Sequence, residues 1–466
     1  MANIYIETFG CQMNQADSRY IADRAASAGY TVVRDPEEAD VLILNTCTVR
    51  DNAERRAYGR LHQFKALKRS DPQRKLVVTG CLAEQDRERI QRVVPHVDAV
   101  FGTKELVALG DRLVIWRPDF EDTEATEERS LLVPIGGADC VEGAFSHLRG
   151  FVTVQRGCSY YCAFCIVPHV RGRFDHRPLG DILAEARERV ADGAREIMLV
   201  GQTVNAYRDP ATGADFGDLC RAVAAISGLE RLAFISPHPK DFTEKIFRDM
   251  AAVEQLNPRI HLPMQSASDR VLRRMNRKYS FAQFEEKVRW IKTYLPQWAI
   301  TTDIIVGFPG ETEEDFEQTR AYCATGLFAQ AFMFVYSPRR GTPAAHWEQV
   351  DAAEVSARFK RLADTQNAVI RAYHDRKLGT IERCLISGPS RKDARKLATK
   401  SLNNVTVVAP MPETYDESLF AREPWLDIRI ETAHVWGCTG TIVRRAGHFR
   451  DAGIPVAQPA FDLVGV

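Results

Sequence analysis

The 466-residue sequence has no long apolar run, no net charge and no low-complexity tract. No stretch approaches the roughly 20 apolar residues of a transmembrane helix, so no membrane partner is expected. The N-terminal segment Met1–Phe9 lacks the basic stretch and apolar core of a signal peptide. Because 62 basic residues balance 62 acidic ones, nucleic acid can be attracted only by local patches. We therefore expect a cytoplasmic protein.

The composition is otherwise ordinary for a globular protein, with 45% hydrophobic and 27% charged residues. A chain of this length folds into about two to four domains. It contains eleven cysteines. Thiols stay reduced in the cytoplasm, so clustered cysteines indicate metal binding or catalysis instead of disulfides.

The first 118 residues alternate β-rich runs with helical periodicity, which predicts a parallel α/β domain. The segment 119–143 begins with an acidic, non-periodic stretch and is predicted to be a linker. The expected strands are Asn3–Thr8, Val41–Leu44 and Leu76–Thr79, and the expected helices are Ala16–Ala28, Asp51–Arg69 and Glu84–Val93.

Residues 144–374 continue the alternation, which predicts a partial (β/α)6 barrel with its ligand site at the carboxyl ends of the strands. Thr312 is predicted to cap the last barrel helix. The expected strands are Phe151–Gln155, Glu196–Val200, Leu232–Ile235, Arg259–Leu262, Thr301–Val306 and Phe332–Tyr336. The expected helices are Leu179–Ala191, Phe216–Ile226, Asp269–Met275, Phe281–Tyr294 and Glu313–Ala324.

A long charged helix, Ala352–Lys377, precedes a third region, 377–446, whose pattern predicts a small all-β barrel without a strong helix. Its basic stretch Arg391–Lys400 is predicted to form a loop, and contact with phosphates and plain solvation weigh about evenly there. The fold class is therefore α/β with a C-terminal β-barrel. The expected strands of the third region are Thr380–Ser387, Asn404–Val408, Trp425–Thr432 and Gly440–Arg444.

Three cysteines, Cys158, Cys162 and Cys165, follow the first predicted barrel strand with C-x₃-C-x₂-C spacing. A closed zinc site uses four ligands, and no matching second pair follows. A [4Fe-4S] cluster held by three thiolates leaves one iron open. The spacing therefore favours an open iron–sulfur site over half a zinc site or stray buried cysteines.

Three further cysteines, Cys11, Cys47 and Cys81, each follow a predicted strand of the N-terminal domain. The carboxyl ends of parallel strands share one edge of a sheet, so these thiolates are expected to converge. One such cysteine alone would be read as a half-buried loop residue, but the repeated placement favours a second metal site. The remaining cysteines are isolated and are expected to pack in cores: Cys140, Cys220, Cys323, Cys384 and Cys438.

Polar residues also follow later barrel strands. The loop Gly201–Tyr207 comes after the second strand, and its glycine lets a ligand approach the backbone closely. Gln265 and Asp303 stand at later strand ends. A ligand site and an ordinary polar turn are both open interpretations for these positions.

The central triad and its setting resemble the radical S-adenosylmethionine superfamily. The N-terminal motifs Gly10–Asn14, Asn45–Arg50 and Gly80–Cys81 look like those of methylthiotransferases. The resemblance is strongest to bacterial tRNA adenosine methylthiotransferases of the MiaB type and extends from Ile4 to about Arg444. Further matching motifs are Ser236–Asp241, His261–Ser266, Thr302–Thr312 and Tyr336–Pro338.

The resemblance implies an enzyme that replaces the hydrogen on carbon 2 of N6-dimethylallyladenosine, next to the anticodon of tRNA, with a methylthio group. Cys158, Cys162 and Cys165 would hold a [4Fe-4S] cluster that cleaves S-adenosylmethionine to a 5′-deoxyadenosyl radical. Cys11, Cys47 and Cys81 would hold an auxiliary [4Fe-4S] cluster that carries the sulfur. S-adenosylmethionine would lie near Gln202, Asn205, Gln265 and Asp303.

The resemblance also implies that the C-terminal barrel is an OB-like TRAM domain that binds RNA, here the anticodon stem-loop of tRNA. An electron donor such as flavodoxin or ferredoxin and a monomeric state are expected, whereas the sulfur donor is not indicated. Two segments, Phe174–His176 and Ala398–Ser401, depart from the family pattern, so no role is transferred to them.

Two alternatives stay open at this point. The chain resembles, less closely, methylthiotransferases that act on threonylcarbamoyl-adenosine of tRNA or on an aspartate of a ribosomal protein. Gln12–Asn14 after Cys11 favours the prenyl-adenosine branch, and the basic stretch favours RNA over protein. A non-catalytic tRNA-binding protein with structural metal sites is the alternative from another class.

Overall fold

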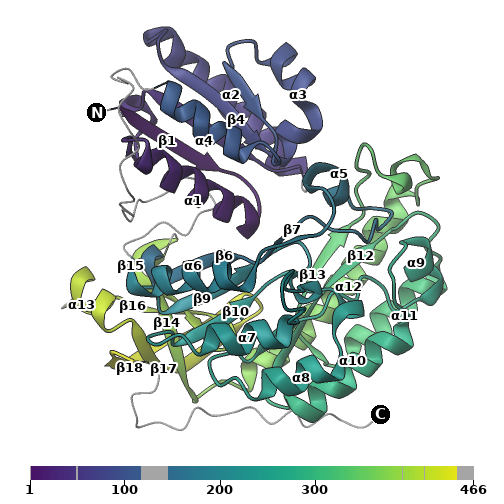
Figure 1. The fold of residues 1–466 in the computed structure, drawn as a ribbon. Helices are drawn as coiled ribbons and strands as arrows, with labels where there is room; N and C mark the ends of the chain where they lie inside the picture. The colour runs from purple at the N-terminus through teal and green to yellow at the C-terminus, as the bar shows by residue number, and fades with distance from the viewer. Residues whose placement is uncertain (1, 49–50, 117–144, 391, 414, 449–466) are drawn as a thin grey trace. The chain divides into compact units, whose positions relative to one another are not determined.

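A computed structural model describes residues 2–48, 51–116, 145–390, 392–413 and 415–448, which form two compact units (Figure 1). The first unit comprises residues 1–142, 151–159 and 166–175, and the second comprises 143–150, 160–165 and 176–466. The chain thus passes between the units repeatedly around the central cysteine triad. The predicted linker 119–143, with Cys140, lies outside the described residues, and the predicted domain boundaries stay predictions.

The first unit is built on a five-stranded parallel sheet of order β2-β1-β3-β4-β5. The central strand β3 is buried along its whole length, as expected of a parallel strand covered on both faces. The parallel α/β prediction is confirmed, although the short β2 and β5 and the helix α4 were not predicted. The strands are β1 (Asn3–Thr8), β2 (Thr31–Val32), β3 (Val41–Thr46), β4 (Lys75–Gly80) and β5 (Ala99–Phe101). The helices are α1 (Gln12–Ser27), α2 (Asp51–Ser70), α3 (Cys81–Val93) and α4 (Leu106–Ile115).

Helices cover both faces of this sheet. One core contains Leu61 and Phe64 of α2 with Leu82 and Ile90 of α3. The opposite core contains side chains of α1 and α4, including Ile21 and Leu109. The first unit also contains the strand β7 (Gln155–Arg156) and the short helix α5 (Val167–Arg171), which come from the central region of the sequence.

The second unit contains parallel strands that alternate with helices, as the partial barrel prediction requires. They form two three-stranded sheets, of orders β10-β9-β6 and β11-β12-β13. Helix α8 (Glu244–Ala251) was not predicted. The strands of these sheets are β6 (Arg149–Thr153), which begins in this unit, β9 (Glu196–Val200), β10 (Arg231–Phe234), β11 (Arg259–His261), β12 (Ala299–Val306) and β13 (Phe328–Val335). The short strand β8 (Asp175–His176) belongs to neither sheet. The other helices are α6 (Leu179–Ala191), α7 (Phe216–Ala224), α9 (Asp269–Arg274), α10 (Phe281–Tyr294) and α11 (Glu313–Ala324).

The cap of α11 confirms the role predicted for Thr312. Its hydroxyl oxygen accepts a hydrogen bond from the Asp315 backbone N–H, and the Asp315 carboxylate accepts one from the Thr312 N–H at 2.8 Å. This reciprocal capping box satisfies two of the backbone donors that a helix N-terminus leaves without partners.

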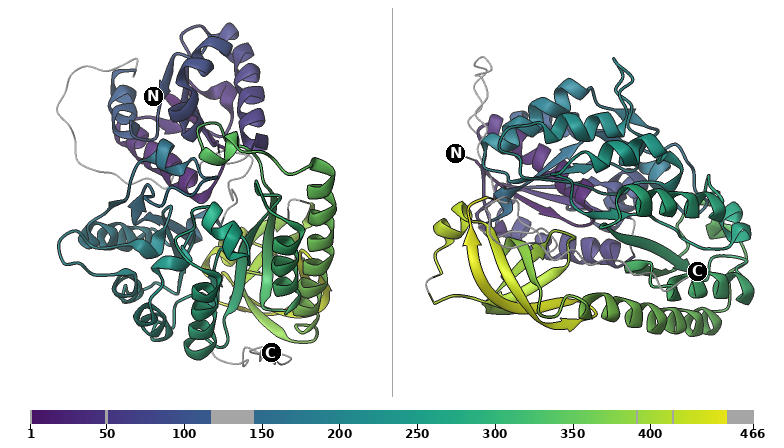
Figure 2. Two further views of the ribbon diagram at one scale, coloured as in Figure 1. Left: turned by 90° about the vertical axis from the view of Figure 1, so that its right-hand side faces the viewer. Right: turned by 90° about the horizontal axis from the view of Figure 1, so that it is seen from below.

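The C-terminal region of the second unit is a closed β-barrel of strand order β14-β15-β16-β18-β17, which confirms the predicted small barrel. Helix α12 (Ala352–Asp375) leads into it (Figure 2), and Trp425 lies fully buried in its core. Among the described residues, no helix combines the length and hydrophobicity needed to cross a bilayer. The barrel strands are β14 (Ile381–Ser390), β15 (Asp393–Ser401), β16 (Thr406–Pro410), β17 (Trp425–His434) and β18 (Gly437–Ala446).

Two expectations for this region were wrong. The basic stretch after Lys392 is not a loop but strand β15, which pairs with β14 and β16. The inward side chains of its second half are Leu397, Thr399 and Ser401, so only one of three is apolar and the usual alternation is hidden. A helix, α13 (Glu417–Arg422), also interrupts the strands; Asp416 caps it and Phe420 packs into the barrel core.

Candidate functional site

Strand register brings the ends of β1, β3 and β4 to one edge of the first unit's sheet. Thr8 pairs with Asn45, Asn45 pairs with Thr79, and Thr46 pairs with Gly80. Cys47 and Cys81 follow their strands directly, and Cys11 follows β1 after a two-residue turn. The three cysteines thus start from neighbouring strand ends, although 36 and 34 residues separate them in sequence.

Two glycines allow the neighbouring strand ends to approach closely. Gly10 has φ of +124°, and a Cβ added there would lie 2.5 Å from Cys47 Cβ and 3.0 Å from Cys47 Sγ. Gly80 has φ of +97°, and its added Cβ would lie 2.3 Å from the Thr46 carbonyl oxygen. Such a backbone conformation and such contacts are open only to glycine.

Asn14 ties together the loops that carry Cys11 and Cys47. Its side-chain amide, fully buried, donates hydrogen bonds of 2.9 Å to the carbonyl oxygens of Phe9 and Thr46. The Asn45 amide in turn donates to the Asn14 carbonyl oxygen at 2.9 Å. These bonds fix the loop conformations from which both thiols project.

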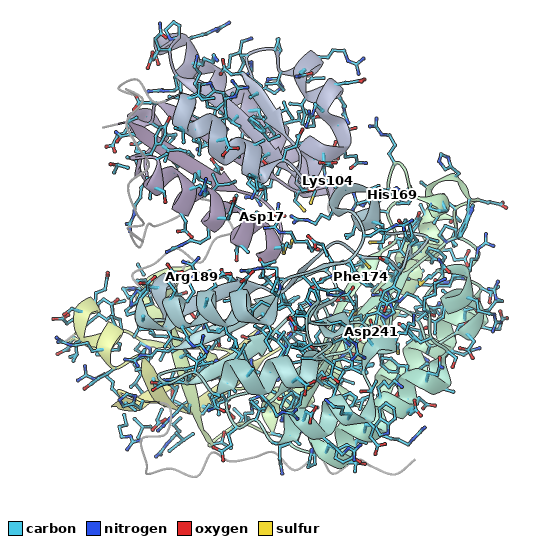
Figure 3. The ribbon with its side chains drawn as sticks, in the orientation of Figure 1. Asp17, Lys104, His169, Phe174, Arg189 and Asp241 are labelled. Atoms are coloured by element: carbon cyan, nitrogen blue, oxygen red, sulfur yellow. The ribbon has the colours of Figure 1, made fainter. Side chains whose placement is uncertain are left out.

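An arginine contacts the third cysteine of this set. Arg171 Nε donates a hydrogen bond to Cys81 Sγ at 3.3 Å. Burial raises the pKa of the Cys81 thiol, and the Arg171 guanidinium opposes that shift because it favours the thiolate. Asp17 of α1 (Figure 3) forms ion pairs with Arg171 at 2.8 Å and with Arg156 at 2.9 Å.

The chemistry of Cys11, Cys47 and Cys81 fits an iron–sulfur cluster. Cys47 and Cys81 are buried, whereas Cys11 is exposed, so the edge is open on one side. Among the residues described, no group of cysteines is as compact as the single-ion arrangement of three ligand atoms within 4.8 Å. A cluster places each thiolate on a separate iron, so its ligand sulfurs stand farther apart than those of one ion.

The cysteines of the central motif are divided between the two units. In the first unit, the Cys158 N–H donates to the Gly172 carbonyl oxygen at 3.0 Å. In the second unit, the Cys165 N–H donates to the Cys162 carbonyl oxygen at 3.0 Å, and Arg277 donates to Cys162 Sγ at 3.4 Å. Sequence reasoning did not identify Arg277.

The four residues predicted to lie near S-adenosylmethionine occupy different surroundings in the second unit. Both ends of the buried Asn205 amide bind the backbone of His238, at 2.8 and 2.9 Å. Gln265 has φ of +65° and is buried, and its side-chain oxygen accepts no hydrogen bond from the part of the chain that the structure describes. The expectation that Asp303 ends a strand was wrong, because β12 continues past it to Val306. The Asp303 carboxylate lies 3.1 Å from His261 Nε2 and is partly exposed. Gln202 lies just beyond the end of β9.

A polar cluster that sequence reasoning left without a role lies beside the Cys162 loop in the second unit. The Tyr160 hydroxyl donates to the Asp241 carboxylate (Asp241 is labelled in Figure 3), and its ring lies 4.5 Å from that of His238. Burial lowers the pKa of His238 well below its usual value, as do Arg277 and Lys240, so this imidazole is neutral at physiological pH. The motif Ser236–Asp241 was the only sequence signal for it.

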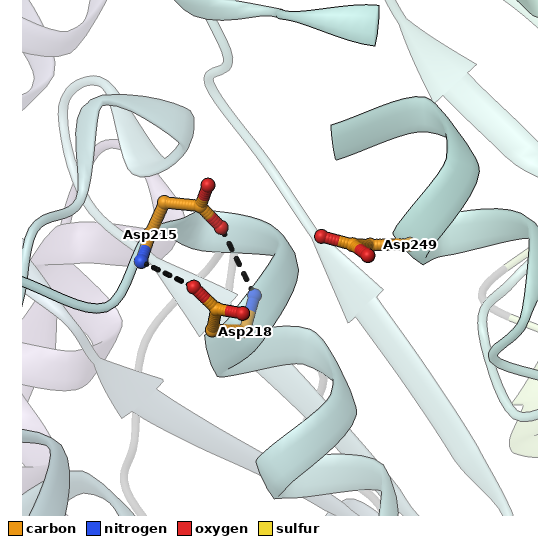
Figure 4. Close-up of side chains that lie close together, drawn as sticks. All are labelled: Asp215, Asp218 and Asp249. Atoms are coloured by element: carbon orange, nitrogen blue, oxygen red, sulfur yellow. Dashed lines mark hydrogen bonds between the residues drawn. The ribbon is translucent and has the colours of Figure 1, made fainter. Parts of the chain in front are cut away.

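The described residues contain one compact group of carboxylates, formed by Asp215, Asp218 and Asp249 (Figure 4). Lys245 Nζ lies 3.0 Å from Asp215 and 2.7 Å from Asp249, and Arg221 contacts Asp218 and Asp249. Asp215 and Asp218 also form the capping box of α7. These two cations pair with all three carboxylates and offset two of their three negative charges, so the group is an ion-pair network at a helix start.

Comparison with known proteins agrees with this geometry. The sequence model of the Uncharacterized protein family UPF0004 matches residues 3–102, and that of the Radical SAM superfamily matches residues 152–323. The fold is similar to that of the radical S-adenosylmethionine methyltransferase TsrM from Kitasatospora setae. The TM-score is 0.54 at 14% identity, over 74% of this chain and 77% of that one.

Curated relatives match over most of the chain. The tRNA-2-methylthio-N(6)-dimethylallyladenosine synthase of Symbiobacterium thermophilum is 38% identical, over 94% of each chain. The enzyme of the same name from Parafrankia sp. is 43% identical, over 84% of this chain and 79% of its own. With such identity over such coverage, the chain belongs to the family of tRNA-2-methylthio-N(6)-dimethylallyladenosine synthases.

Proposed function

We propose that this protein converts N6-dimethylallyladenosine beside the anticodon of tRNA to its 2-methylthio derivative, using S-adenosylmethionine and two [4Fe-4S] clusters. The observation that carries the proposal is the placement of Cys11, Cys47 and Cys81 at the ends of three adjacent parallel strands. The C2–H bond of adenine carries no acidic proton, so acid–base chemistry alone does not suffice and a radical is required.

The two cysteine sets have different roles in this proposal. Cys158, Cys162 and Cys165 hold the cluster that serves S-adenosylmethionine, and Cys11, Cys47 and Cys81 hold the auxiliary cluster. When bound, the clusters supply a one-electron reductant and a site for the transferred sulfur. One S-adenosylmethionine provides the methyl group, and a second provides the radical.

The polar residues of the second unit support the binding of S-adenosylmethionine. Gln265 offers a buried acceptor at a positive φ, and Asp303 offers a carboxylate within β12, one residue before the Ile304 that bridges Gln265. Asn205 holds the backbone at His238, beside the loop of Cys162. Gln202 completes the set of candidates.

The C-terminal barrel is the proposed contact for the tRNA anticodon stem-loop. Its strand β15 carries the exposed basic side chains of Arg395 and Lys396, and the exposed Lys392 precedes the strand. Exposed arginine and lysine contribute affinity for phosphates without reading sequence. We further propose a monomeric cytoplasmic enzyme that receives electrons from a flavodoxin or ferredoxin.

Mass spectrometry of tRNA nucleosides from a deletion strain tests the proposed substrate. The methylthio derivative of the prenylated nucleoside should disappear, and the chain should restore it. A C47A variant should not restore it, whereas C323A, which changes a buried cysteine outside both sets, should. The proposed substrate would be rejected if the deletion strain kept its methylthiolated prenyl-adenosine. In that case it would lose methylthiolated threonylcarbamoyl-adenosine or a modified ribosomal aspartate instead.

Iron content and cleavage of S-adenosylmethionine test the proposed chemistry. Anaerobically reconstituted protein should bind about eight irons per chain, and either cysteine set replaced by alanine should leave about four. The protein with an intact Cys158–Cys162–Cys165 set should form 5′-deoxyadenosine when reduced. Absence of 5′-deoxyadenosine from fully loaded protein would favour a tRNA-binding protein with structural metal sites.

A further inference from the structure

The segment that follows the central cysteine motif packs into the first unit. Ile166 and Val170 form a small buried cluster with Cys81, and the Thr103 hydroxyl donates to the Val170 carbonyl oxygen. Helix α5, which contains Val170 and ends at Arg171, is therefore anchored beside the proposed auxiliary site. It lies only a few residues beyond Cys165 in sequence.

Among the described residues, the polar contacts of Arg171 all lie inside this unit. Its Nε donates to Cys81 Sγ at 3.3 Å, and its NH2 group donates to Asn14 Oδ1 at 2.8 Å. The same NH2 group lies 2.8 Å from the Asp17 carboxylate. Arg171 is 8% exposed and Asp17 is 1% exposed, so water screens these interactions weakly.

The Arg171 guanidinium lies where it can pair with a cluster-bound sulfur at Cys81. Asp17 is shared between two guanidiniums, those of the buried Arg171 and of the partly exposed Arg156. A buried cation without a matching anion is costly. A cysteine that ligates iron is a thiolate, and Cys81 Sγ accepts the hydrogen bond of the Arg171 Nε–H.

We propose that Arg171 is a positioning residue that binds the Cys81 thiolate of the auxiliary cluster and sets the reduction potential of that cluster. This inference rests on the proposed function. A hydrogen bond and a positive charge at a ligand sulfur stabilise the more negative, reduced state, so they raise the potential. Asn14 and Asp17 hold the guanidinium in place, and Asn14 also orders the loops of Cys11 and Cys47.

The test uses full-length protein in which Cys158, Cys162 and Cys165 are alanine, so that any bound cluster is the auxiliary one. This parent should bind about four irons per chain. The auxiliary cluster is then titrated with a reductant and followed by electron paramagnetic resonance. R171Q removes the charge and the Nε–H donor, R171K retains the charge, and R173Q changes an exposed arginine of the same segment as the matched control.

In R171Q, the ratio of reduced to oxidised cluster at a fixed potential should fall about tenfold, which is 59 mV for a one-electron couple. R171K should show a smaller fall, and R173Q none. If R171Q takes up no iron, R171K becomes the test variant. R171K that loads about four irons and has a lower reduction potential than the parent supports the inference. A parent-like potential in the loaded variant, or failure of both variants to load iron, overturns it. A parent that binds no iron would instead refute the auxiliary cluster of the proposed function.

Discussion

Replacement of Gly10 by alanine should damage the auxiliary site and leave the S-adenosylmethionine site intact. The new methyl carbon would lie 2.5 Å from Cys47 Cβ. Carbon atoms in contact prefer separations of about 3.5–4.0 Å, so the Cys11 and Cys47 loops would have to move apart by about 1 Å. The Asn14 hydrogen bonds that join these loops resist such a shift.

The substitution has two costs that a control can separate. A non-glycine residue in a left-handed conformation costs roughly 1–2 kcal/mol, whatever surrounds it. Gly213 also has positive φ, +73°, but an added Cβ there would meet nothing within 4 Å. G213A therefore carries a backbone cost of this kind without the steric clash, and only G10A should disturb a cysteine.

Iron analysis and activity distinguish the two variants. Displaced supporting residues typically weaken metal binding about 10- to 100-fold, so G10A should retain about four of about eight irons. G10A should still form 5′-deoxyadenosine but should transfer little or no methylthio group to tRNA, whereas G213A should behave as wild type. Full iron content with normal methylthiolation in G10A would refute the close packing of the Gly10 and Cys47 loops.

Three further predictions concern the second unit. T312A should lower the free energy of unfolding by about 1 kcal/mol, measured by urea denaturation, because it removes the cap of α11; an unchanged midpoint would contradict this. Burial raises the pKa of Glu311 from 4.5 to about 7. The folded protein therefore keeps a proton that the unfolded chain has released, and the free energy of unfolding should fall as the pH rises between these values. E311Q should remove that part of the pH dependence, and an identical slope in wild type and E311Q would exclude Glu311 as its source. Finally, Ca²⁺ should leave the Tm unchanged, because Lys245 and Arg221 already pair with Asp215, Asp218 and Asp249; a rise in Tm that D249N abolishes would show a cation site.

Local patterns predicted most of the fold because they depend on neighbouring residues. Strands β1 and β9 and helices α6, α10 and α11 have the predicted limits, since each combines clear periodicity with a sharp boundary. Strand β15 was missed because its inward face contains threonine and serine. Helix α8 was missed although Thr243 caps it and Ile246, Phe247 and Met250 are buried. The segment is only eight residues long, which leaves little room for a helical period to stand out.

For the candidate site, the sequence could predict only the positions of residues that follow strand ends. Each of Cys11, Cys47 and Cys81 follows a strand, so their common edge followed from the rule for parallel sheets. The contact between Arg171 and Cys81 joins residues 90 positions apart, and no periodicity encodes it. Its single sequence signal was an arginine shortly after the central cysteine motif, in a segment whose departures from the family pattern discouraged any assignment.

Because α5 belongs to the first unit, residues 3–102 do not by themselves contain the complete surroundings of Cys81. The chain completes the surroundings of Cys81 only after it has passed through Cys158, Cys162 and Cys165. Transplanting residues 3–102 alone into another scaffold would leave behind Ile166, Val170 and Arg171, and with them the apolar cover and the cation next to that sulfur. Recombination that exchanges the N-terminal sheet between relatives should therefore succeed only when the segment 166–175 is inherited with it.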